Sequence, residues 1–204
     1  MSRFVCTTRN IKPSLHNVLL RSYTTWSPTE ENYVCHIWEA ARATSAAPLF
    51  FEPLKLRSSG ATFGDGALGL NNPIFEVLHE ADILWPKAKI RSVLSIGTGL
   101  ADVKGLDTSQ LKMWDVLKTC VDLSINANKQ AENFAKTKIG REMFGNRTYF
   151  RFDVDRNIET ISLEEWEKLD EIDGLTEAYL GRPDKEKDLL DCARSLCNRI
   201  ASGC

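Results

Sequence analysis

The sequence lacks several patterns, and each absence excludes a class of protein. No run of apolar residues is long enough to span a bilayer, and the first ten residues lack the apolar core of a secretory signal. The six cysteines include no C-x-x-C pair, which argues against a disulfide framework or a zinc site and favours reduced thiols in the cytosol. Neither sign of charge predominates. The net charge of −2, from 26 Lys and Arg and 28 Asp and Glu, predicts no binding of nucleic acid.

Patterns that bind metals and nucleotides are also missing. The histidines His16, His36 and His79 are far apart and lack the spacing of metal ligands. The stretch GTGLAD (97–102) follows an apolar strand, as a dinucleotide-binding loop would. It lacks the third glycine of such a loop, and no helix follows at once. We therefore expect neither a metal ion nor a nucleotide cofactor.

What the sequence contains is the composition of an ordinary globular protein. Of its 204 residues, 43% are hydrophobic and 26% are charged, which is enough apolar material for a sizeable core. Apolar stretches with the periods of strands and helices alternate along the chain, and this alternation predicts a layered α/β fold. Strands are predicted over 4–9, 17–23, 90–99 and 147–154, and helices over 33–45, 73–85, 111–137, 162–180 and 183 to about 200.

Some predicted helices also show which face they should bury. In the helix over 33–45, Val34, Ile37, Trp38 and Ala41 recur at helical spacing, which predicts an apolar face against the core. Tryptophans at positions 38, 85 and 114 fall on apolar stripes of this kind, so core packing is the first expectation, with a place beside a lipid as the alternative. Ser162 followed by Glu165 forms a capping box that opens the helix over 162–180.

The stretch TFGDGALGLNNP (62–73) places a carboxylate between two glycines. Thr62 and Phe63 have the character of a strand end, and Gly64 and Gly66 allow a sharp turn with positive φ or the close approach of another backbone or a ligand. Asn72 and Pro73 suit the start of a helix. The residues themselves leave two interpretations of Asp65: a side chain that only hydrogen-bonds the turn, or a carboxylate presented for chemistry.

Three motifs then occur in order, which are WEAARATSAAPLFF (38–51), FGDGALGLNNP (63–73) and VLSIGTG (93–99). This order resembles the C-terminal half of a patatin-like phospholipase domain. That family has a helix ending in A-x-x-A-T-S-A-A-P-x-x-F, a D-G-[AG] turn before N-N-P, and a strand ending in S-[IL]-G-T-G. The tail through LEEWEKLDEIDGLTEAYL (163–180) resembles fungal-type members. The resemblance implies an incomplete three-layer α/β/α sheet over residues 1–154, with 155–204 as a helical C-terminal extension packed on it.

The resemblance also implies a role for the motif Asp65, Gly66, Ala67. In the family, a Ser–Asp dyad cleaves acyl esters of phospholipids and neutral lipids, and the Asp of D-G-[AG] accepts the proton of the serine. Asp65 would therefore be the catalytic general base. An ordinary aspartate, with a pKa near about 3.9, is a weak base, but burial against apolar walls would raise that pKa.

The sequence departs from the family at the nucleophile. The family's serine lies in G-x-S-x-G, and its oxyanion loop is D-G-G-G-x-R-G; neither motif occurs here. In the family both precede the helix that begins here near Tyr33, so the sequence looks like one half of the catalytic domain. Ser45 in ATSAAP and Ser95 in LSIGTG are not on glycine-flanked elbows, and a helix end and a buried strand position explain them.

Two functions from different classes follow from this comparison. The first is a lipid acyl hydrolase of which this chain carries the Asp65 half, with a phospholipid or other acyl lipid as substrate. The second is a non-catalytic patatin-like module that binds lipid or protein. Either function fits a cytoplasmic protein with transient contact at membrane surfaces.

Overall fold

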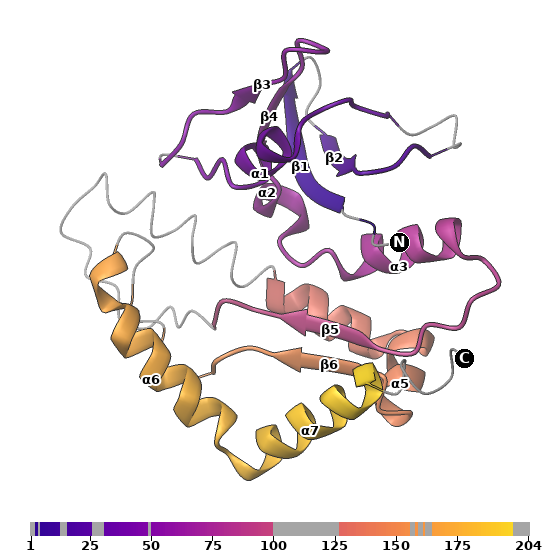
Figure 1. Ribbon diagram of the computed structural model, residues 1–204, viewed down its shortest axis with the longest axis vertical. Helices are drawn as coiled ribbons and strands as arrows, with labels where there is room; N and C mark the ends of the chain where they lie inside the picture. Colours follow the sequence, from indigo (N-terminus) through magenta and orange to yellow (C-terminus); the bar gives the residue numbers. More distant parts are fainter. Residues whose placement is uncertain are drawn as a thin grey trace. The chain divides into compact units, whose positions relative to one another are not determined.

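The computed structural model describes residues 3, 5–12, 16–25, 31–48, 50–99, 127–155, 158, 161 and 165–197. It divides into two compact units, residues 1–73 and residues 74–204, and each unit has a sheet of its own (Figure 1). The fold is mixed α/β, as the alternation of apolar stretches predicts. The predicted boundary between residues 154 and 155 lies inside the second unit and stays a prediction.

The first unit is built on a four-stranded antiparallel sheet in the order β2-β1-β4-β3. The two predicted strands are present as β1 (Val5–Lys12) and β2 (His16–Arg21). The two prolines in PLFFEPLKL (48–56) bar a helix and predict an extended segment, which contains β3 (Leu54–Lys55), whereas only the first two residues of β4 (Thr62–Asp65) were predicted as strand. These strands are too short to show a clear alternation of apolar and polar residues. They form because they pair with longer neighbouring strands.

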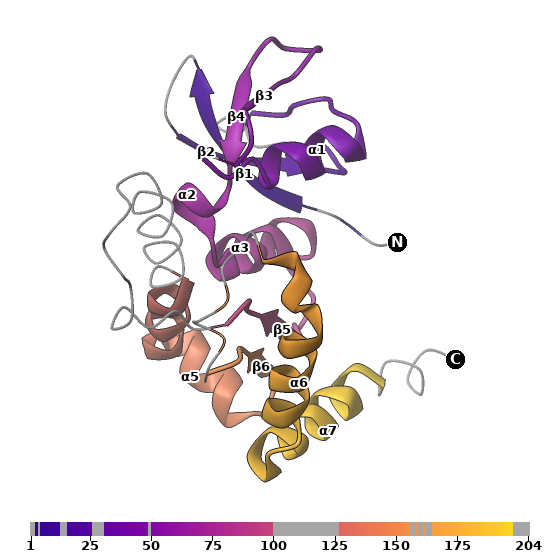
Figure 2. The same ribbon diagram turned by 90° about the vertical axis from the view of Figure 1, so that its left-hand side faces the viewer.

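Helix α1 (Ile37–Thr44) packs on one face of this sheet (Figure 2). The core between helix and sheet holds Val18, Leu20, Ala43, Leu56, Ala61 and Phe63. Ala43 is fully buried, and its small side chain lets the helix approach the strands closely. The ring of Tyr33, just before α1, meets the ring of Phe63 edge-on, with 5.0 Å between centroids.

The apolar stripe predicted to face the core is on the outer side of α1. Ile37 is 89% exposed and Trp38 is 56% exposed, while Glu39 is only 5% exposed. The outward direction of this apolar stripe, opposite to the predicted one, has a local cause. The carboxylate of Glu39 accepts a hydrogen bond from the backbone N–H of His36, 2.8 Å away, so this side chain turns back over the start of the helix rather than out to water. Trp85 is also exposed, contrary to prediction, and Trp114 lies outside the described residues.

The second unit contains a two-stranded parallel sheet of β5 (Val93–Ile96) and β6 (Tyr149–Phe152). Helix α3 (Ile74–Leu84) precedes β5 and begins one residue after the predicted start. A cluster of buried side chains joins this helix to the strands and to the helical segments before β6, and consists of Ile74, Phe134, Met143 and Tyr149. The rings of Phe134 and Tyr149 lie 4.9 Å apart.

The described part of the helix predicted over 111–137 is helical and ends one residue before the predicted end. Residues 127–136 are helical, and a new helix, α5 (Lys138–Gly145), begins directly after Thr137. The hydroxyl oxygen of Thr137 accepts a hydrogen bond from the N–H of Gly140 at 2.9 Å, which caps the new helix. Gly140 lies so close to the preceding segment that an added Cβ would be 1.9 Å from the carbonyl oxygen of Phe134.

The C-terminal part of the chain is helical, as predicted, but helix begins after Glu165, the second residue of the predicted capping box, rather than at 162. A short 3-10 turn, η3 (Trp166–Lys168), leads into α6 (Leu169–Leu180), which is followed by α7 (Pro183–Cys197). The predicted capping serine at position 162 lies outside the described residues. Arg147, between α5 and β6, pairs with Asp188 and Asp191 of α7. None of the helices among the described residues is long and apolar enough to cross a bilayer.

The position of Gly140 gives a prediction about stability. Replacing Gly140 by Ala forces a Cβ into backbone atoms that cannot move aside, so we expect a loss of more than about 2 kcal/mol in the free energy of unfolding. Gly174, inside α6, has nothing within 4 Å of an added Cβ. Gly174→Ala is therefore the matched control and should leave stability unchanged or raise it by about 0.5–1 kcal/mol. Urea unfolding followed by circular dichroism measures both, and equal effects would contradict the packing described here.

Candidate active site

Asp65 is the last residue of β4, and its side chain is buried. The strand continues two residues past its predicted end at Phe63, so that Asp65 pairs with Thr8 of β1. The residue is 9% exposed. Because alternate residues of a strand share a face, the carboxylate lies on the same face as the ring of Phe63, which is fully buried in the core of this unit.

Gly66 lets the end of β4 lie directly on β1. The predicted positive φ is wrong: Gly66 has φ −63°, and positive φ occurs among the described glycines only at Gly60 and Gly99. The other expected reason for a glycine here, the close approach of another backbone, is confirmed. A Cβ at Gly66 would lie 2.1 Å from the carbonyl oxygen of Thr7. A Cβ at Gly64 would meet only the tip of the Ile11 side chain, 2.8 Å away.

The turn after α1 holds Asp65 and Gly66 by hydrogen bonds between backbone groups. The N–H of Asp65 donates to the carbonyl oxygen of Ala46 at 3.2 Å, and the N–H of Gly66 donates to that of Thr44 at 3.4 Å. The Thr44 hydroxyl donates to the carbonyl oxygen of Thr7 at 2.5 Å, which ties the same turn to β1. The motif A-T-S-A-A-P and the motif D-G-A, twenty residues apart in sequence, thus form one local structure.

The two oxygens of the Asp65 carboxylate differ in their surroundings. Oδ1 accepts a hydrogen bond from the N–H of Ala67 at 2.7 Å, at the start of the short helix α2 (Ala67–Leu70). Oδ2 has no hydrogen bond to any residue in the described part of the chain. Burial raises the pKa of Asp65 above its ordinary value, and the bond from Ala67 opposes part of that rise. The side chain therefore does hydrogen-bond the turn, and it also keeps one oxygen for a further proton donor.

Two buried polar residues of β1 lie on the same face as Asp65, and the sequence reading did not single them out. Thr8, opposite Asp65, is fully buried and donates its hydroxyl hydrogen to the carbonyl oxygen of Val18 at 3.3 Å. Asn10 is 1% exposed, and its side-chain oxygen has no hydrogen-bond partner among the described residues. The signal in the sequence was their spacing of two, which places both side chains on one face of a strand. A strand face with polar residues is usually exposed, whereas this one is buried.

The serines weighed as alternative nucleophiles have structural roles. Ser45 caps the C-terminus of α1, and its hydroxyl donates to the carbonyl oxygen of Ala41 at 2.8 Å. Ser95 is partly buried on β5, where its hydroxyl oxygen accepts a hydrogen bond from Arg151 at 2.8 Å. Ser45 lies in the unit of Asp65, and Ser95 lies in the other unit.

The third motif, S-I-G-T-G, is held in the second unit by residues of β6 and the loop after it. The N–H of Gly97 donates to the carbonyl oxygen of Phe152 at 2.8 Å, and the N–H of Gly99 donates to the Asp153 carboxylate at 2.8 Å. Arg151 forms an ion pair with Asp153 at 2.5 Å, in a position where both side chains are largely buried. The sequence reading missed Arg151 and Asp153, whose spacing of two in R-F-D was their only local signal.

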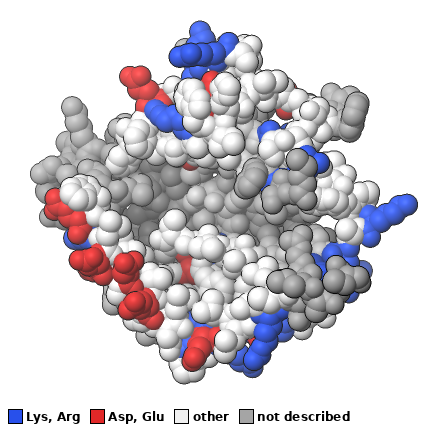
Figure 3. All heavy atoms as spheres, in the orientation of Figure 1, with Lys and Arg blue, Asp and Glu red and all other residues white. Residues whose placement is uncertain are grey.

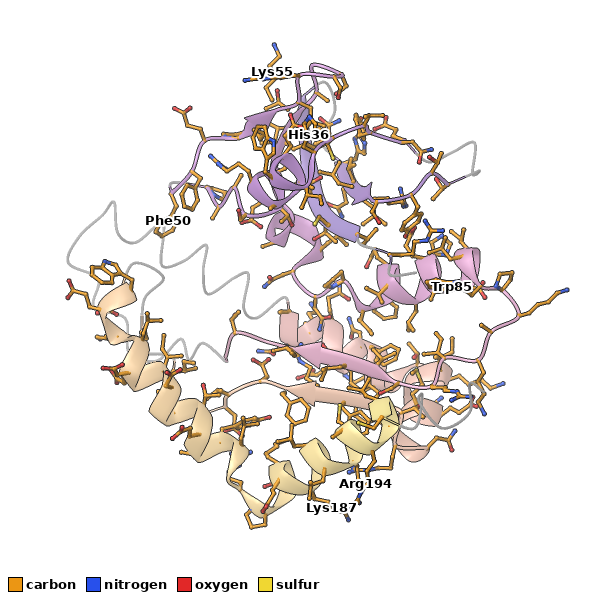
Figure 4. The ribbon with its side chains drawn as sticks, in the orientation of Figure 1. His36, Phe50, Lys55, Trp85, Lys187 and Arg194 are labelled. Carbon is orange, nitrogen blue, oxygen red and sulfur yellow. The ribbon has the colours of Figure 1, made fainter. Side chains whose placement is uncertain are left out.

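The histidines are dispersed, as the sequence indicates. His16 lies 3.4 Å from the carboxylate of Glu31, and His36 precedes α1 (Figure 4). His79 is exposed on α3 in the second unit. In the described ranges, no group of three or more His, Cys, Asp or Glu side chains is arranged to hold a metal ion.

Comparison with known proteins finds relatives of the segment that contains Asp65. The family model for patatin-like phospholipase matches residues 8–78, which include part of β1, all of α1 and the D-G-A turn. Calcium-independent phospholipase A2-gamma of Mus musculus is 32% identical over 176 residues, covering 82% of this chain. Phospholipase A I of Arabidopsis thaliana is 41% identical over 63 residues, covering 31% of this chain. No solved structure matches the chain.

The chain spans only a small part of these relatives. The alignments cover 21% of the mouse protein and 5% of the Arabidopsis protein. The matched stretch of the family model contains Asp65 and the turn after α1 that positions it. The resemblance drawn from the three sequence motifs is therefore confirmed: this is a chain of the patatin-like phospholipase family, with the family's domain recognised at residues 8–78.

Proposed function

We propose that Asp65 is the general base of a Ser–Asp dyad that hydrolyses acyl esters of phospholipids or other acyl lipids. The observation that carries this proposal is the state of the carboxylate. It is buried, burial raises its pKa, one oxygen is fixed by the Ala67 N–H, and the other has no partner in the described part of the chain. Perturbed carboxylates of this kind are concentrated at catalytic sites. The phospholipase names of the relatives support the choice of substrate.

In the proposed reaction, Oδ2 of Asp65 takes the proton from a serine hydroxyl as the serine oxygen attacks the ester carbonyl. The alcohol of the lipid leaves with a proton returned by Asp65, and the acyl group stays on the serine. A water molecule then attacks the acyl-serine and gives a proton to Asp65, which passes it to the serine oxygen as the bond to the acyl group breaks and the free fatty acid leaves. The bond between Ala67 N–H and Oδ1 fixes the direction in which Oδ2 points throughout these steps.

The dyad also needs a serine, which the family carries in G-x-S-x-G. These 204 residues contain no such sequence, so we propose that they supply the Asp65 half of the site. We further propose a cytoplasmic location with contact at membrane surfaces, where the lipid substrate is found.

The absence of G-x-S-x-G from these residues favours one alternative, a non-catalytic module that binds lipid or protein. In that case the buried carboxylate of Asp65 would only stabilise the turn, through Ala67. The two functions differ in one measurable respect, which is whether hydrolysis depends on Asp65 once a nucleophile is supplied.

We expect a fusion of a family segment that carries G-x-S-x-G ahead of residue 3 to hydrolyse a soluble chromogenic acyl ester, and residues 1–204 alone to give no rate above buffer. In the fusion, Asp65→Asn should lower kcat by about 10³–10⁴-fold, because an amide keeps the shape but cannot take the serine proton. Glu52→Gln, which neutralises an exposed carboxylate in the same unit, is the matched control and should leave the rate unchanged. Equal activity of the Asp65→Asn fusion would refute the dyad.

A second prediction concerns stability as a function of pH. Because the folded state raises the pKa of Asp65, folding favours the protonated carboxyl. This contribution to stability is fully present below the ordinary pKa, about 3.9, and is lost as the pH rises through the raised pKa. Above that range the fold holds a buried charge, which Asp65→Asn removes.

We therefore expect Asp65→Asn to become progressively more stable than the parent chain as the pH rises from about 4 towards neutral. The urea midpoint of both chains, measured across this range, gives the difference directly. Glu52→Gln should show no such trend, since its carboxylate is exposed in both folded and unfolded states. A parallel pH dependence for Asp65→Asn and the parent would mean that Asp65 is no more buried than an ordinary surface acid.

A further inference from the structure

Helix α1 carries large apolar side chains on the face that points away from its sheet. Ile37 is 89% exposed and Trp38 is 56% exposed, and Val34, just before the helix, is 81% exposed. The opposite face of the same helix, with Ala43, is packed against the strands. Large apolar side chains gathered on an exposed face mark a surface that binds something apolar.

A second segment extends this surface. Phe51 is 55% exposed, and the guanidinium carbon of Arg42 lies 5.1 Å from the centre of its ring. Arg42 follows Trp38 by four residues and therefore lies on the same side of α1. It is held there by a 2.8 Å hydrogen bond to the carbonyl oxygen of Glu52. We call Val34, Ile37, Trp38 and Phe51 the α1 patch.

Basic side chains border the α1 patch. The hydroxyl of Ser58 donates to the carbonyl oxygen of Val34 at 2.6 Å, so the turn between β3 and β4 lies beside the patch. This turn and its strand carry the exposed residues Arg57 and Lys55, and Lys55 projects away from the ribbon in Figure 4. With Arg42, three cations border the patch. Glu52, next to Phe51, and Glu31, three residues before Val34, are exposed acids of the same unit, whereas Glu39 is buried.

The second unit also has two large apolar side chains that are exposed, but their surroundings differ from those of the α1 patch. Trp166 is 72% exposed and Leu169 is 60% exposed, at the start of α6. The charged side chains around them are predominantly acidic, and Asp and Glu gather along α6 in Figure 3. An anionic surface would attract the α1 patch and repel this second pair.

We propose that the α1 patch docks on the surface of a phospholipid bilayer. Ile37 and Trp38 would enter the boundary between headgroups and acyl chains, a depth at which tryptophan is favoured. Arg42, Lys55 and Arg57 would lie against the headgroup phosphates, and their charges complement an anionic leaflet. The proposal rests on the proposed function, since it names how the chain meets a lipid substrate, and it uses only residues of the first unit.

The test uses the 204-residue chain and two kinds of vesicle, phosphatidylcholine alone and phosphatidylcholine with about one part in four of phosphatidylserine. Co-sedimentation measures the fraction bound. The double variant Ile37→Ser, Trp38→Ser should reduce the partition coefficient at least about tenfold, because two large apolar side chains no longer leave water. The matched control, Trp166→Ser with Leu169→Ser, should change it by less than about twofold.

A charge variant tests the basic border separately. Lys55→Gln with Arg57→Gln should lower binding to the anionic vesicles about fivefold per charge removed. The same variant should leave binding to phosphatidylcholine alone unchanged. With brominated lipid, binding should quench tryptophan fluorescence of the parent chain, and Trp38→Phe should reduce that quenching while binding persists. Thermal unfolding checks that each variant is folded. We expect all of them to be folded, because the replaced side chains are exposed.

Several results would overturn the proposal. These are a folded parent chain that binds neither kind of vesicle, an equal loss of binding in the two double variants that replace a tryptophan, and quenching that Trp38→Phe leaves unchanged. Size-exclusion chromatography provides another: a dimer that the patch variant dissociates, with vesicle binding unchanged, would assign the patch to a second copy of the chain. Hydrolysis of a soluble ester by the fusion reports on Asp65 and not on the patch, so the docking proposal and the proposed function can fail separately.

Discussion

The contact between Gly66 and the carbonyl oxygen of Thr7 determines where the candidate base lies. With any side chain at position 66, the end of β4 could not lie on β1. Once it does, the N–H groups of Asp65 and Gly66 come within reach of the turn that follows α1. The D-G-A motif thus combines a buried carboxylate, a glycine that leaves space for β1, and an N–H at Ala67 that fixes one carboxylate oxygen.

Among the described residues of the first unit, two carboxylates are buried, and they lie in different local structures. Glu39 is buried at the start of α1, where it accepts a hydrogen bond from the N–H of His36 and completes a helix terminus. Asp65 also accepts one backbone hydrogen bond, but burial raises its pKa. If Asp65 is the proposed base, a carboxylate that lowers stability at neutral pH would be kept for its chemistry, which is the usual relation between catalytic groups and stability.

The sequence predicted the parts of this structure that depend on local patterns. The strands β1 and β2 and the helices α3 and α7 follow from hydrophobic period, and Asp65 was found through its motif. The burial of Asp65 could not be predicted, because it depends on pairing with Thr8, 57 positions earlier in the chain. The exposed face of α1 could not be predicted either. A stripe of Ile37 and Trp38 has the same period whether it faces a sheet or a solvent surface, and the direction is set by Ala43 and by the buried carboxylate of Glu39.

Asp153 makes contacts in the second unit besides its ion pair with Arg151. Its carboxylate holds the N–H of Gly99, in the loop after β5, while its own N–H donates to the hydroxyl of Tyr179 in α6 at 3.2 Å. One residue therefore ties the S-I-G-T-G loop to a helix that begins seventeen residues after β6 ends. Asp153 therefore links α6 to that loop by two hydrogen bonds, which makes α6 a support of the motif rather than a separate appendage.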